Sequence, residues 1–472
     1  MNSPQYAVSP SAGAKNVIEV FRRRVAEQPD KLVYTFLHDD EGQCSQRTFA
    51  QIDREARAIA TRLRQLGLQG QRALLVYDPG IDFNAALVGC IYGGVIAVPA
   101  YPPDPMRSHR VLPRLQSIAT NSQGTVLLTS SSLLEWAEGL FSRLSGIDTV
   151  VATDEIDPAL ADQWQEPHAD HDTVAILQYT SGSTGTPRGV VIDHGNLIAN
   201  MSQINMLLHE ESNVLSSWLP PYHDMGLVGH LLSWHSARHM VMLSPLAFFQ
   251  RPIRWLRTFA EYGATCSAAP DFAYDHCIQK VTAEERRTLD LSNWQVALNG
   301  AEMIRPETLE RFLEVFGPCG MRREAFYPSY GMAEGTVMVT GGERNVCYIT
   351  KTVDLTALAE NRVVEVEPGS ANSRTFVGCG RAVPGTSVIV VDPDTLQRLP
   401  DGEVGEIWTI GPNVARGYWN DATATEERFR AFTADGEGPY LRTGDLGFLD
   451  RGELFVTGRI KDVIIVWGRN HY

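Results

Sequence analysis

The stretch that decides the fold is Val174-Ala-Ile-Leu177, followed directly by Gln178-Tyr-Thr-Ser-Gly-Ser-Thr-Gly-Thr-Pro-Arg-Gly-Val190. The short apolar run is typical of a buried strand, and the glycine- and hydroxyl-rich segment after it is typical of a loop. Backbone N–H and side-chain O–H groups of such a loop can converge on anionic oxygens, and Arg188 supplies fixed positive charge. A linker is the competing interpretation, but a linker is not expected between two apolar runs. The segment therefore predicts a phosphate-binding loop, although it lacks the GK[ST] of the P-loop.

The sequence on either side alternates between helix-like and strand-like patterns. Apolar residues at helical spacing predict helices over residues 17–25 and 59–66, the second ended by Gly67. This alternation predicts an α/β fold with doubly wound, mostly parallel sheets. Buried strands are expected at 73–77, 126–128, 174–177 and 241–243. After about Arg362 the pattern predicts a β-rich subdomain with strands at 363–366, 387–391, 405–410, 452–456 and 462–467.

Composition excludes several classes of protein. The chain has 472 residues, 43% hydrophobic and 21% charged, which is the balance of a globular protein. A net charge of -15 repels phosphate backbones, so nucleic acid is not an expected partner. The 7 scattered cysteines form no CxxC pair, which predicts reduced thiols, a cytoplasmic setting and no zinc site. The uncharged run 83–103 is broken by glycine and proline, so we expect a buried helix and strand there rather than a membrane span.

Five motifs in a fixed order resemble those of the adenylate-forming enzymes, which include acyl-CoA synthetases, luciferases, peptide-synthetase adenylation domains and fatty acyl-AMP ligases. The motifs are TSGSTGTPRG at 180–189, NGAE at 299–302, YGMAE at 330–334, TGD at 443–445 and GRIKD at 458–462. The likeness extends from about Val17 to Tyr472. Members of the family usually carry lysine where this chain has Arg188, a change that keeps the charge but alters reach and geometry.

The resemblance implies a binding site for ATP and Mg²⁺. Tyr330 is expected to stack on the adenine, Asp445 to hold both ribose hydroxyls and Glu334 to hold Mg²⁺. Without the resemblance, a core tyrosine is an alternative for Tyr330, a turn-forming aspartate is favoured for Asp445, and a surface carboxylate stays open for Glu334. The expected catalytic residues are Glu334, His223 and Arg188, and Lys461 stands at the hinge. The expected ATP-binding residues are Thr180, Ser181, Gly182, Ser183, Thr184, Gly185, Asn299, Gly300, Ala301, Glu302, Tyr330, Gly331, Met332, Asp445 and Arg459.

Two further stretches resemble fatty acyl-AMP ligases in particular: SWLPPYHDMGLVGH at 217–230 and AAPDFAY at 268–274. The resemblance implies that His223 lies near the acyl carboxylate. It also implies an acyl site in which small residues leave a channel. A structural role stays open for His223 and is favoured for His230 and His235. Asp224 supports an alternative, an amino-acid adenylation domain, where an aspartate pairs with the substrate ammonium. The expected acyl-binding residues are His223, Met225, Gly226, Leu227 and Gly229.

We therefore expect an enzyme that activates a fatty acid to fatty acyl-AMP and releases pyrophosphate. The resemblance implies transfer of the acyl group to the phosphopantetheine arm of an acyl carrier protein in polyketide or peptide synthesis. Residues 346–376 resemble an inserted segment that is associated with poor CoA thioester formation in this branch, and an ordinary surface excursion is the competing interpretation. A fatty acyl-CoA ligase and a non-catalytic acyl- or nucleotide-binding module remain alternatives.

The expected organisation has four parts. Residues 1–15 form a mobile N-terminus, 16–360 the α/β adenylation subdomains with the ATP and acyl sites, 361–458 the β-rich subdomain, and 459–472 the hinge and first strand of a C-terminal domain. Relatives continue through that small domain, which carries a lysine that reaches the α-phosphate. The chain is expected to lack most of this domain, and therefore to turn over slowly.

Overall fold

The computed structural model describes residues 13–40, 42–103, 108–180, 187–208, 214–462, 464–466 and 469–471. It divides into two compact units, and each is described by itself. Unit 1 comprises Met1–Met206, Glu210–Phe248 and Ala415–Ala422, and unit 2 comprises Leu207–His209, Phe249–Val414 and Thr423–Tyr472. The N-terminus expected to be mobile falls mostly outside the described residues.

A six-stranded sheet with the order β6-β5-β3-β4-β7-β8 forms the centre of unit 1. Four of its strand pairs are parallel, and only β7 and β8 run antiparallel. The predicted mostly parallel sheet is confirmed. Its strands are β3 (Arg72–Val76), β4 (Ile96–Ala100), β5 (Val126–Thr129), β6 (Thr149–Ala152), β7 (Val174–Thr180) and β8 (Arg188–Asp193).

A second group of strands in unit 1 is paired in the order β9-β10-β1-β2. The pairs β9/β10 and β10/β1 are parallel, and β1/β2 is antiparallel. The strands are β1 (Leu32–Leu37), β2 (Cys44–Thr48), β9 (Val214–Ser217) and β10 (Met240–Leu243).

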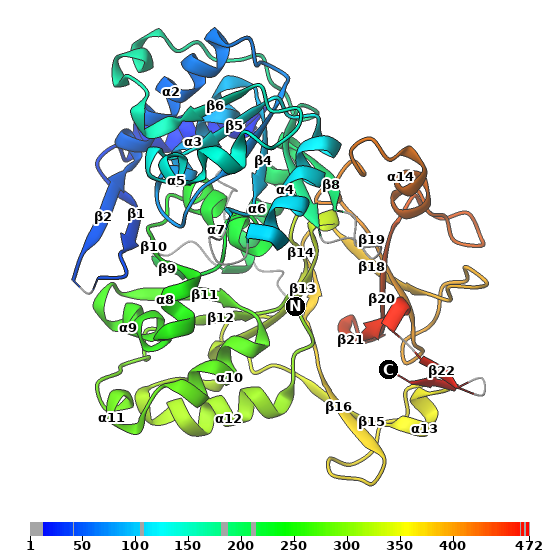
Figure 1. The fold of residues 1–472 in the computed structure, drawn as a ribbon. Helices are drawn as coiled ribbons and strands as arrows, with labels where there is room; N and C mark the ends of the chain where they lie inside the picture. The colour runs from blue at the N-terminus through cyan, green and yellow to red at the C-terminus, as the bar shows by residue number, and fades with distance from the viewer. Residues whose placement is uncertain are drawn as a thin grey trace. The chain divides into compact units, whose positions relative to one another are not determined.

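The two helices expected near the N-terminus are present as α1 and α2, but α2 begins at Phe49, ten residues before the predicted start. Thr48 and Gln51 form a capping box that starts α2, and Gly67 follows its end at φ 71°. The run 83–103 forms α3 and β4, with α3 packed against α2 (Figure 1). Over the described residues, no helix is long and apolar enough to cross a membrane. The helices are α1 (Val17–Glu27), α2 (Phe49–Gln65), α3 (Asp82–Gly93), α4 (Ser108–Ser122), α5 (Ser131–Phe141), α6 (His194–Leu208), α7 (Asp224–His235) and α8 (Pro245–Gln250), with 3-10 helices η1 (Thr153–Glu155) and η2 (Pro158–Gln163).

Unit 2 begins with strands paired in the order β11-β12-β13-β14-β17, of which the first three are parallel. An aromatic core lies against them, in which the Phe259 and Trp294 rings stack 4.1 Å apart. The strands are β11 (Ala264–Ala269), β12 (Val296–Asn299), β13 (Phe326–Gly331), β14 (Met338–Gly341) and β17 (Arg381–Ala382). The helices are α9 (Ile253–Glu261), α10 (Asp271–Lys280), α11 (Ala283–Arg286), α12 (Pro306–Phe316), η3 (Gly317–Cys319), η4 (Arg323–Ala325) and η5 (Ala333–Gly335).

The later part of unit 2 is rich in β-structure, as expected, and is drawn in orange to red in Figure 1. An antiparallel sheet of four strands has the order β18-β19-β20-β21. The elements are β18 (Ser387–Val391), β19 (Gly405–Ile410), α14 (Ala422–Phe429), β20 (Leu441–Asp450), β21 (Glu453–Arg459), η6 (Ile460–Asp462), β22 (Ile464–Val466) and β23 (Arg469–His471).

The prediction of a strand at 363–366 is wrong. This segment makes only isolated bridges, one from Arg362 and one from Glu365. Its backbone is divided between two partners, because the Val363 N–H donates to the Gly402 carbonyl whereas the Val366 N–H donates to the Thr352 carbonyl. No continuous ladder can form on either side.

Candidate active site

The expected phosphate loop joins two paired strands. β7 ends at Thr180 and β8 begins at Arg188, and these two residues are partners in the ladder. The Arg188 Nε lies 3.6 Å from Asp421 Oδ2, and its guanidinium lies over the Tyr418 ring at 5.3 Å. The Arg188 guanidinium is therefore held, beside the Asp421 carboxylate, where the two strands meet the loop. Ser181, Gly182, Ser183, Thr184 and Gly185 lie outside the described residues, and their phosphate contacts stay predictions.

His223 occupies the position just before α7, and its backbone is extended there. Gln178 Nε2 donates to the Tyr222 carbonyl at 2.8 Å, which joins the end of β7 to the loop that carries His223. The Tyr101 hydroxyl lies 3.2 Å from His223 Nε2. His223 is exposed, but desolvation by the surrounding groups and the charge of Arg114 lower its pKa. The ring is therefore uncharged near neutral pH.

The expected acyl-binding residues follow on the first turns of α7. Leu227 is buried and Met225 is half-buried. A side chain at Gly226 would place its Cβ 2.1 Å from the Pro220 carbonyl oxygen, so close packing of the helix on the preceding loop requires glycine there. At Gly229 a Cβ would lie 3.3 Å from the Met240 Cε. Packing thus accounts for Gly226, and the acyl channel stays a prediction.

His230 and His235, farther along α7, are both buried. The His235 ring nitrogens lie 3.1 Å from Ser236 Oγ and 3.3 Å from Ser202 Oγ. Burial lowers the pKa of each histidine to about 3, so both are neutral. These contacts support a structural role for His235, and burial among aromatic rings supports one for His230.

The expected adenine, ribose and hinge-side residues come together within unit 2. The Tyr330 hydroxyl donates to Asp445 Oδ2 at 2.7 Å, and Arg459 Nε lies 3.4 Å from Asp445 Oδ1. Burial raises the pKa of Asp445, and the Tyr330 hydrogen bond and the Arg459 charge oppose that rise. The fold thus joins residues separated by 115 positions in the sequence.

Glu334 lies in η5 with its side chain largely buried. Two residues later Thr336 has a φ of 67°, a left-handed value that is strained for a β-branched residue. The Thr336 hydroxyl donates to the Asn413 carbonyl at 2.6 Å, and the Asn413 amide donates to the Gly335 carbonyl at 3.3 Å. Asn413 therefore holds the turn that carries Glu334. Sequence reasoning missed Asn413, because no motif surrounds it.

Beside Tyr330, the backbone itself requires glycine. A Cβ at Gly331 would lie 1.7 Å from the Val337 carbonyl oxygen, so no side chain fits. Met332, the next residue of the motif, is extended before η5. The YGMAE motif is therefore a tightly folded turn as well as a set of side chains.

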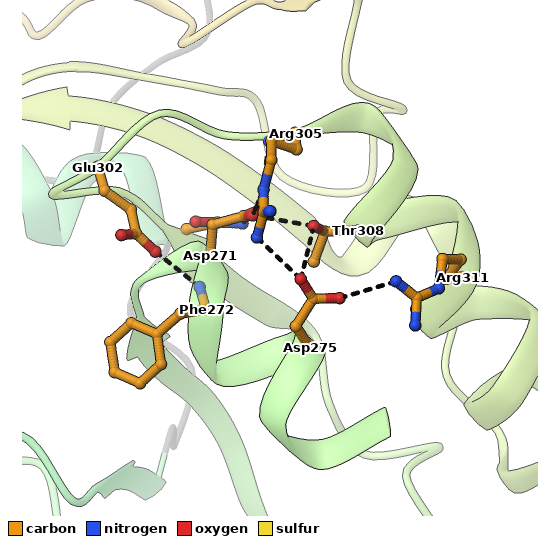
Figure 2. Close-up of polar contacts among 8 residues, drawn as sticks. Asp271, Phe272, Asp275, Glu302, Arg305, Thr308 and Arg311 are labelled. Atoms are coloured by element: carbon orange, nitrogen blue, oxygen red, sulfur yellow. Dashed lines mark hydrogen bonds and ion pairs between the residues drawn. The ribbon is translucent and has the colours of Figure 1, made fainter. Parts of the chain in front are cut away.

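A polar network anchors the expected adenine segment to α10, as Figure 2 shows. Fully buried Asp271 accepts hydrogen bonds from Arg305 Nε at 2.9 Å, the Thr308 hydroxyl at 2.9 Å and Asn299 Nδ2 at 3.3 Å. Glu302 Oε1 accepts a 2.6 Å bond from the Phe272 N–H, so both ends of the segment are tied to the start of α10.

Between these two ties the segment turns sharply at Ala301, which has a φ of 69°. Gly300 packs closely, since a Cβ there would lie 3.0 Å from the Ser329 carbonyl oxygen on β13. Asp271 belongs to the AAPDFAY stretch, and its place directly after Pro270 at a helix start was the signal that could have found it.

Residues 346–376, the expected insertion, contain a hairpin that packs on the four-stranded sheet of unit 2. It consists of β15 (Thr350–Asp354), α13 (Leu355–Leu358) and β16 (Ser373–Val377). Phe376 is buried in one core cluster with Phe448 and Phe455. Lys351 Nζ lies 2.6 Å from Asp450 Oδ2. The hairpin thus contributes Val353, Leu358 and Phe376 to this core cluster, whereas most of the other residues of the segment are exposed or half-buried, and its identity as the insertion stays a prediction. Lys461, the expected hinge residue, is exposed in η6.

The parallel sheets and the Tyr330–Asp445–Arg459 contact agree with the architecture expected of an adenylate-forming enzyme. Residues 21–419 match the AMP-binding enzyme family. The medium-chain-fatty-acid–[acyl-carrier-protein] ligase JamA of Moorena producens is 44% identical, over 97% of this chain and 78% of that protein. The long-chain-fatty-acid–AMP ligase FadD32 of Mycolicibacterium smegmatis is 37% identical, over 94% of this chain and 74% of that protein.

Solved structures agree with these relatives. The fatty acid AMP ligase from Legionella pneumophila superposes with a TM-score of 0.90 at 38% identity, over 98% of this chain and 79% of that chain. A second structure from that organism, a fatty acyl-adenylate ligase in complex with acyl adenylate and pyrophosphate, gives the same TM-score of 0.90. The chain belongs to the AMP-binding enzyme family, in its fatty acyl-AMP ligase branch.

Proposed function

We propose that this protein activates a fatty acid with ATP to fatty acyl-AMP, and that the acyl group then passes to an acyl carrier protein. The observation that carries the proposal is the likeness, over 98% of the chain, to the Legionella enzyme solved with acyl adenylate and pyrophosphate. The 2.7 Å contact between Tyr330 and Asp445 supports it, because the residues expected to hold adenine and ribose lie together.

The chemistry needs alignment and charge rather than a protein nucleophile. A carboxylate oxygen of the fatty acid attacks the α-phosphorus of ATP, and pyrophosphate leaves with the electrons of the broken P–O bond. In the second step the phosphopantetheine thiolate attacks the acyl carbonyl, and AMP leaves. Because the first step brings two anions together, fixed positive charge is needed. Arg188 at the base of the loop is suited to supply part of it.

Mg²⁺ is the metal that this proposal includes. The described residues contain no cluster of three or more carboxylate, histidine or cysteine side chains placed to hold a metal by themselves. A single carboxylate suits Mg²⁺, which is commonly bound through one or two carboxylates together with substrate phosphates. Glu334, an oxygen donor held in a tight turn, fits that requirement. When bound, Mg²⁺ would neutralise phosphate charge.

The acyl carrier protein is preferred over CoA as the acceptor. Relatives named as acyl-carrier-protein ligases support this, and so does the packed hairpin at 350–377, which could restrict domain rotation. We further propose a role in polyketide or peptide synthesis and a cytoplasmic setting, the latter supported by seven free cysteines.

Product analysis tests the proposal directly. The protein is incubated with ATP, Mg²⁺ and a mixture of fatty acids, and the adenylates are identified by mass spectrometry. Holo-carrier protein or CoA is then added in parallel reactions. We expect acyl-AMP, acyl-carrier product and little acyl-CoA, with Glu334→Gln depressing pyrophosphate release. Abundant acyl-CoA would indicate an acyl-CoA ligase, and exchange that depends only on amino acids would refute fatty acid activation.

A further inference from the structure

Three side chains of unit 1, Tyr101, Arg114 and Tyr222, form a compact aromatic and cationic group with His223, which we call the His223 cluster. The Tyr101 ring lies 4.2 Å from the Tyr222 ring and meets the His223 ring edge-on at 5.4 Å. The guanidinium of Arg114, on α4, lies over the Tyr101 ring at 4.3 Å. Tyr101 therefore contacts both the histidine and the arginine.

The charge of Arg114 has no carboxylate partner within the part of the chain that the structure describes, and its buried Nε atom has no hydrogen-bond partner there. Two other arginines of unit 1 share a carboxylate partner. Arg22 and Arg57 both pair with buried Asp53, at 2.7 and 2.8 Å. Withdrawing a guanidinium from water without a counter-ion is costly, so a site built this way is suited to a ligand that brings negative charge.

The surroundings of Arg114 favour an anion at this place. The N-terminus of α7, which starts directly after His223, contributes partial positive charge. His223 is neutral near pH 7 and can offer a hydrogen bond but no charge. The following residue, Asp224, places a negative charge near the same group, because burial and the Asp224 charge raise the pKa of Tyr101 whereas the Arg114 charge lowers it. The Asp224 Oδ1 accepts a hydrogen bond from the Met225 N–H at 2.7 Å. Fixed positive charge in the His223 cluster therefore comes from Arg114.

On the basis of the proposed function, we propose that Arg114 binds the fatty acid carboxylate beside His223 before adenylation, with Tyr101 positioning both residues. The arginine would hold the carboxylate by a charge-assisted hydrogen bond. Its role is in substrate binding, so its loss should affect the Michaelis constant for the acid more than turnover at saturation.

The test compares a charged ligand with a neutral one of the same length. Dodecanoate and dodecanamide are titrated against wild type, Arg114→Gln, Arg114→Lys and the control Arg143→Gln, whose arginine is exposed on the surface of unit 1. We expect Arg114→Gln to weaken dodecanoate binding about 10- to 100-fold and to leave dodecanamide binding within about twofold. Arg114→Lys should recover part of the loss, and Arg143→Gln should match wild type.

Each other result has a definite meaning. An equal loss for acid and amide, or no loss for the acid, would overturn the assignment of Arg114. A defect confined to acyl transfer from preformed acyl-AMP would place the arginine at the phosphate of phosphopantetheine and also overturn it. A wild type that binds dodecanoate through Arg114 but makes no acyl-AMP from any acid contradicts the proposed function alone. Thermal melts show whether each variant folds. If Arg114→Gln does not fold, the comparison of dodecanoate with dodecanamide is made on Arg114→Lys instead.

Discussion

Replacing Tyr330 by phenylalanine separates the hydroxyl of this residue from its ring. The hydroxyl donates to Asp445 Oδ2 at 2.7 Å, and each of the two residues is only 9% exposed. A buried hydrogen bond to a charged acceptor contributes about 1.5–3 kcal/mol, and water cannot easily replace it at this depth. We therefore expect Tyr330→Phe to lower the free energy of unfolding by about 2 kcal/mol at neutral pH.

The same strand supplies a matched control. Tyr327 is also buried on β13, but its hydroxyl has no hydrogen-bond partner among the described residues. Removing a polar group that is already unsatisfied relieves a desolvation cost. Tyr327→Phe should therefore be neutral or slightly stabilising, although the number of atoms removed is the same.

The loss at Tyr330 should also depend on pH. Burial raises the pKa of Asp445 above its unfolded value, so protonation favours the folded state at low pH, and this contribution is lost as the pH rises through the folded pKa. The hydrogen bond opposes the rise, so Tyr330→Phe raises the pKa of Asp445 further. The destabilisation should be full above that pKa and should shrink as the pH falls below it.

Urea denaturation of wild type and both variants, at pH 7.5 and at the lowest pH where wild type stays folded, provides the measurement. A Tyr330→Phe variant as stable as wild type at pH 7.5, or a Tyr327→Phe variant that loses as much, would refute the reasoning. A loss of equal size at both pH values would show that the acceptor is not the Asp445 carboxylate.

Three further predictions concern other parts of the chain. Gly331→Ala should lower the free energy of unfolding by about 3 kcal/mol, because the new Cβ would lie 1.7 Å from a backbone carbonyl oxygen. The control Gly139→Ala on α5, where a Cβ would have nothing within 4 Å, should raise the melting temperature slightly. Equal melting temperatures for the two variants would contradict this prediction. Burial lowers the pKa of His194 to about 4 and that of His230 to about 3, so the unfolded chain binds more protons than the folded one below about pH 6.5. The free energy of unfolding should therefore fall as the pH drops toward 4, by about 3 kcal/mol per histidine. His230→Phe should flatten the plot of urea midpoint against pH, and an unchanged slope would exclude that histidine. Phe376→Ala should lower the free energy of unfolding by about 3–4 kcal/mol, because it leaves a cavity between the hairpin and the sheet. It should also raise the ratio of acyl-CoA to acyl-carrier product measured by mass spectrometry. An unchanged ratio would show that the hairpin does not influence the choice of acceptor.

Much of the fold could be predicted because its signals are local. The apolar run 174–177 became β7, and the run 83–103 became a helix and a strand because glycine and proline interrupt it. The segment 363–366 carries the same strand-like composition and is not a strand. Its partners are supplied by two different segments, and composition contains no information about which segments lie beside it.

Some residues of the candidate site could likewise be predicted from local motifs, and others could not. Tyr330, Glu334 and Asp445 were found because each lies within a short motif whose residue types suit the chemistry. Tyr101 and Arg114 belong to no such motif, and Tyr101 reaches His223 across 122 positions of sequence. Asn413, which holds the turn at Glu334, and Asp271, which anchors the adenine segment, are ordinary polar residues until the fold gives them partners.

The sequence by itself determined the order of the motifs, the alternation of strands and helices and the class of reaction, because backbone preference and motif chemistry act over a few neighbouring residues. Only the tertiary structure decided that Tyr330 bonds to Asp445, that Arg114 lies beside Tyr101 without a carboxylate partner among the described residues, and that Phe376 of the hairpin is buried with Phe448 and Phe455 of β20 and β21. Such contacts join residues far apart in the chain, and they arise from close packing of whole elements, which no local pattern specifies.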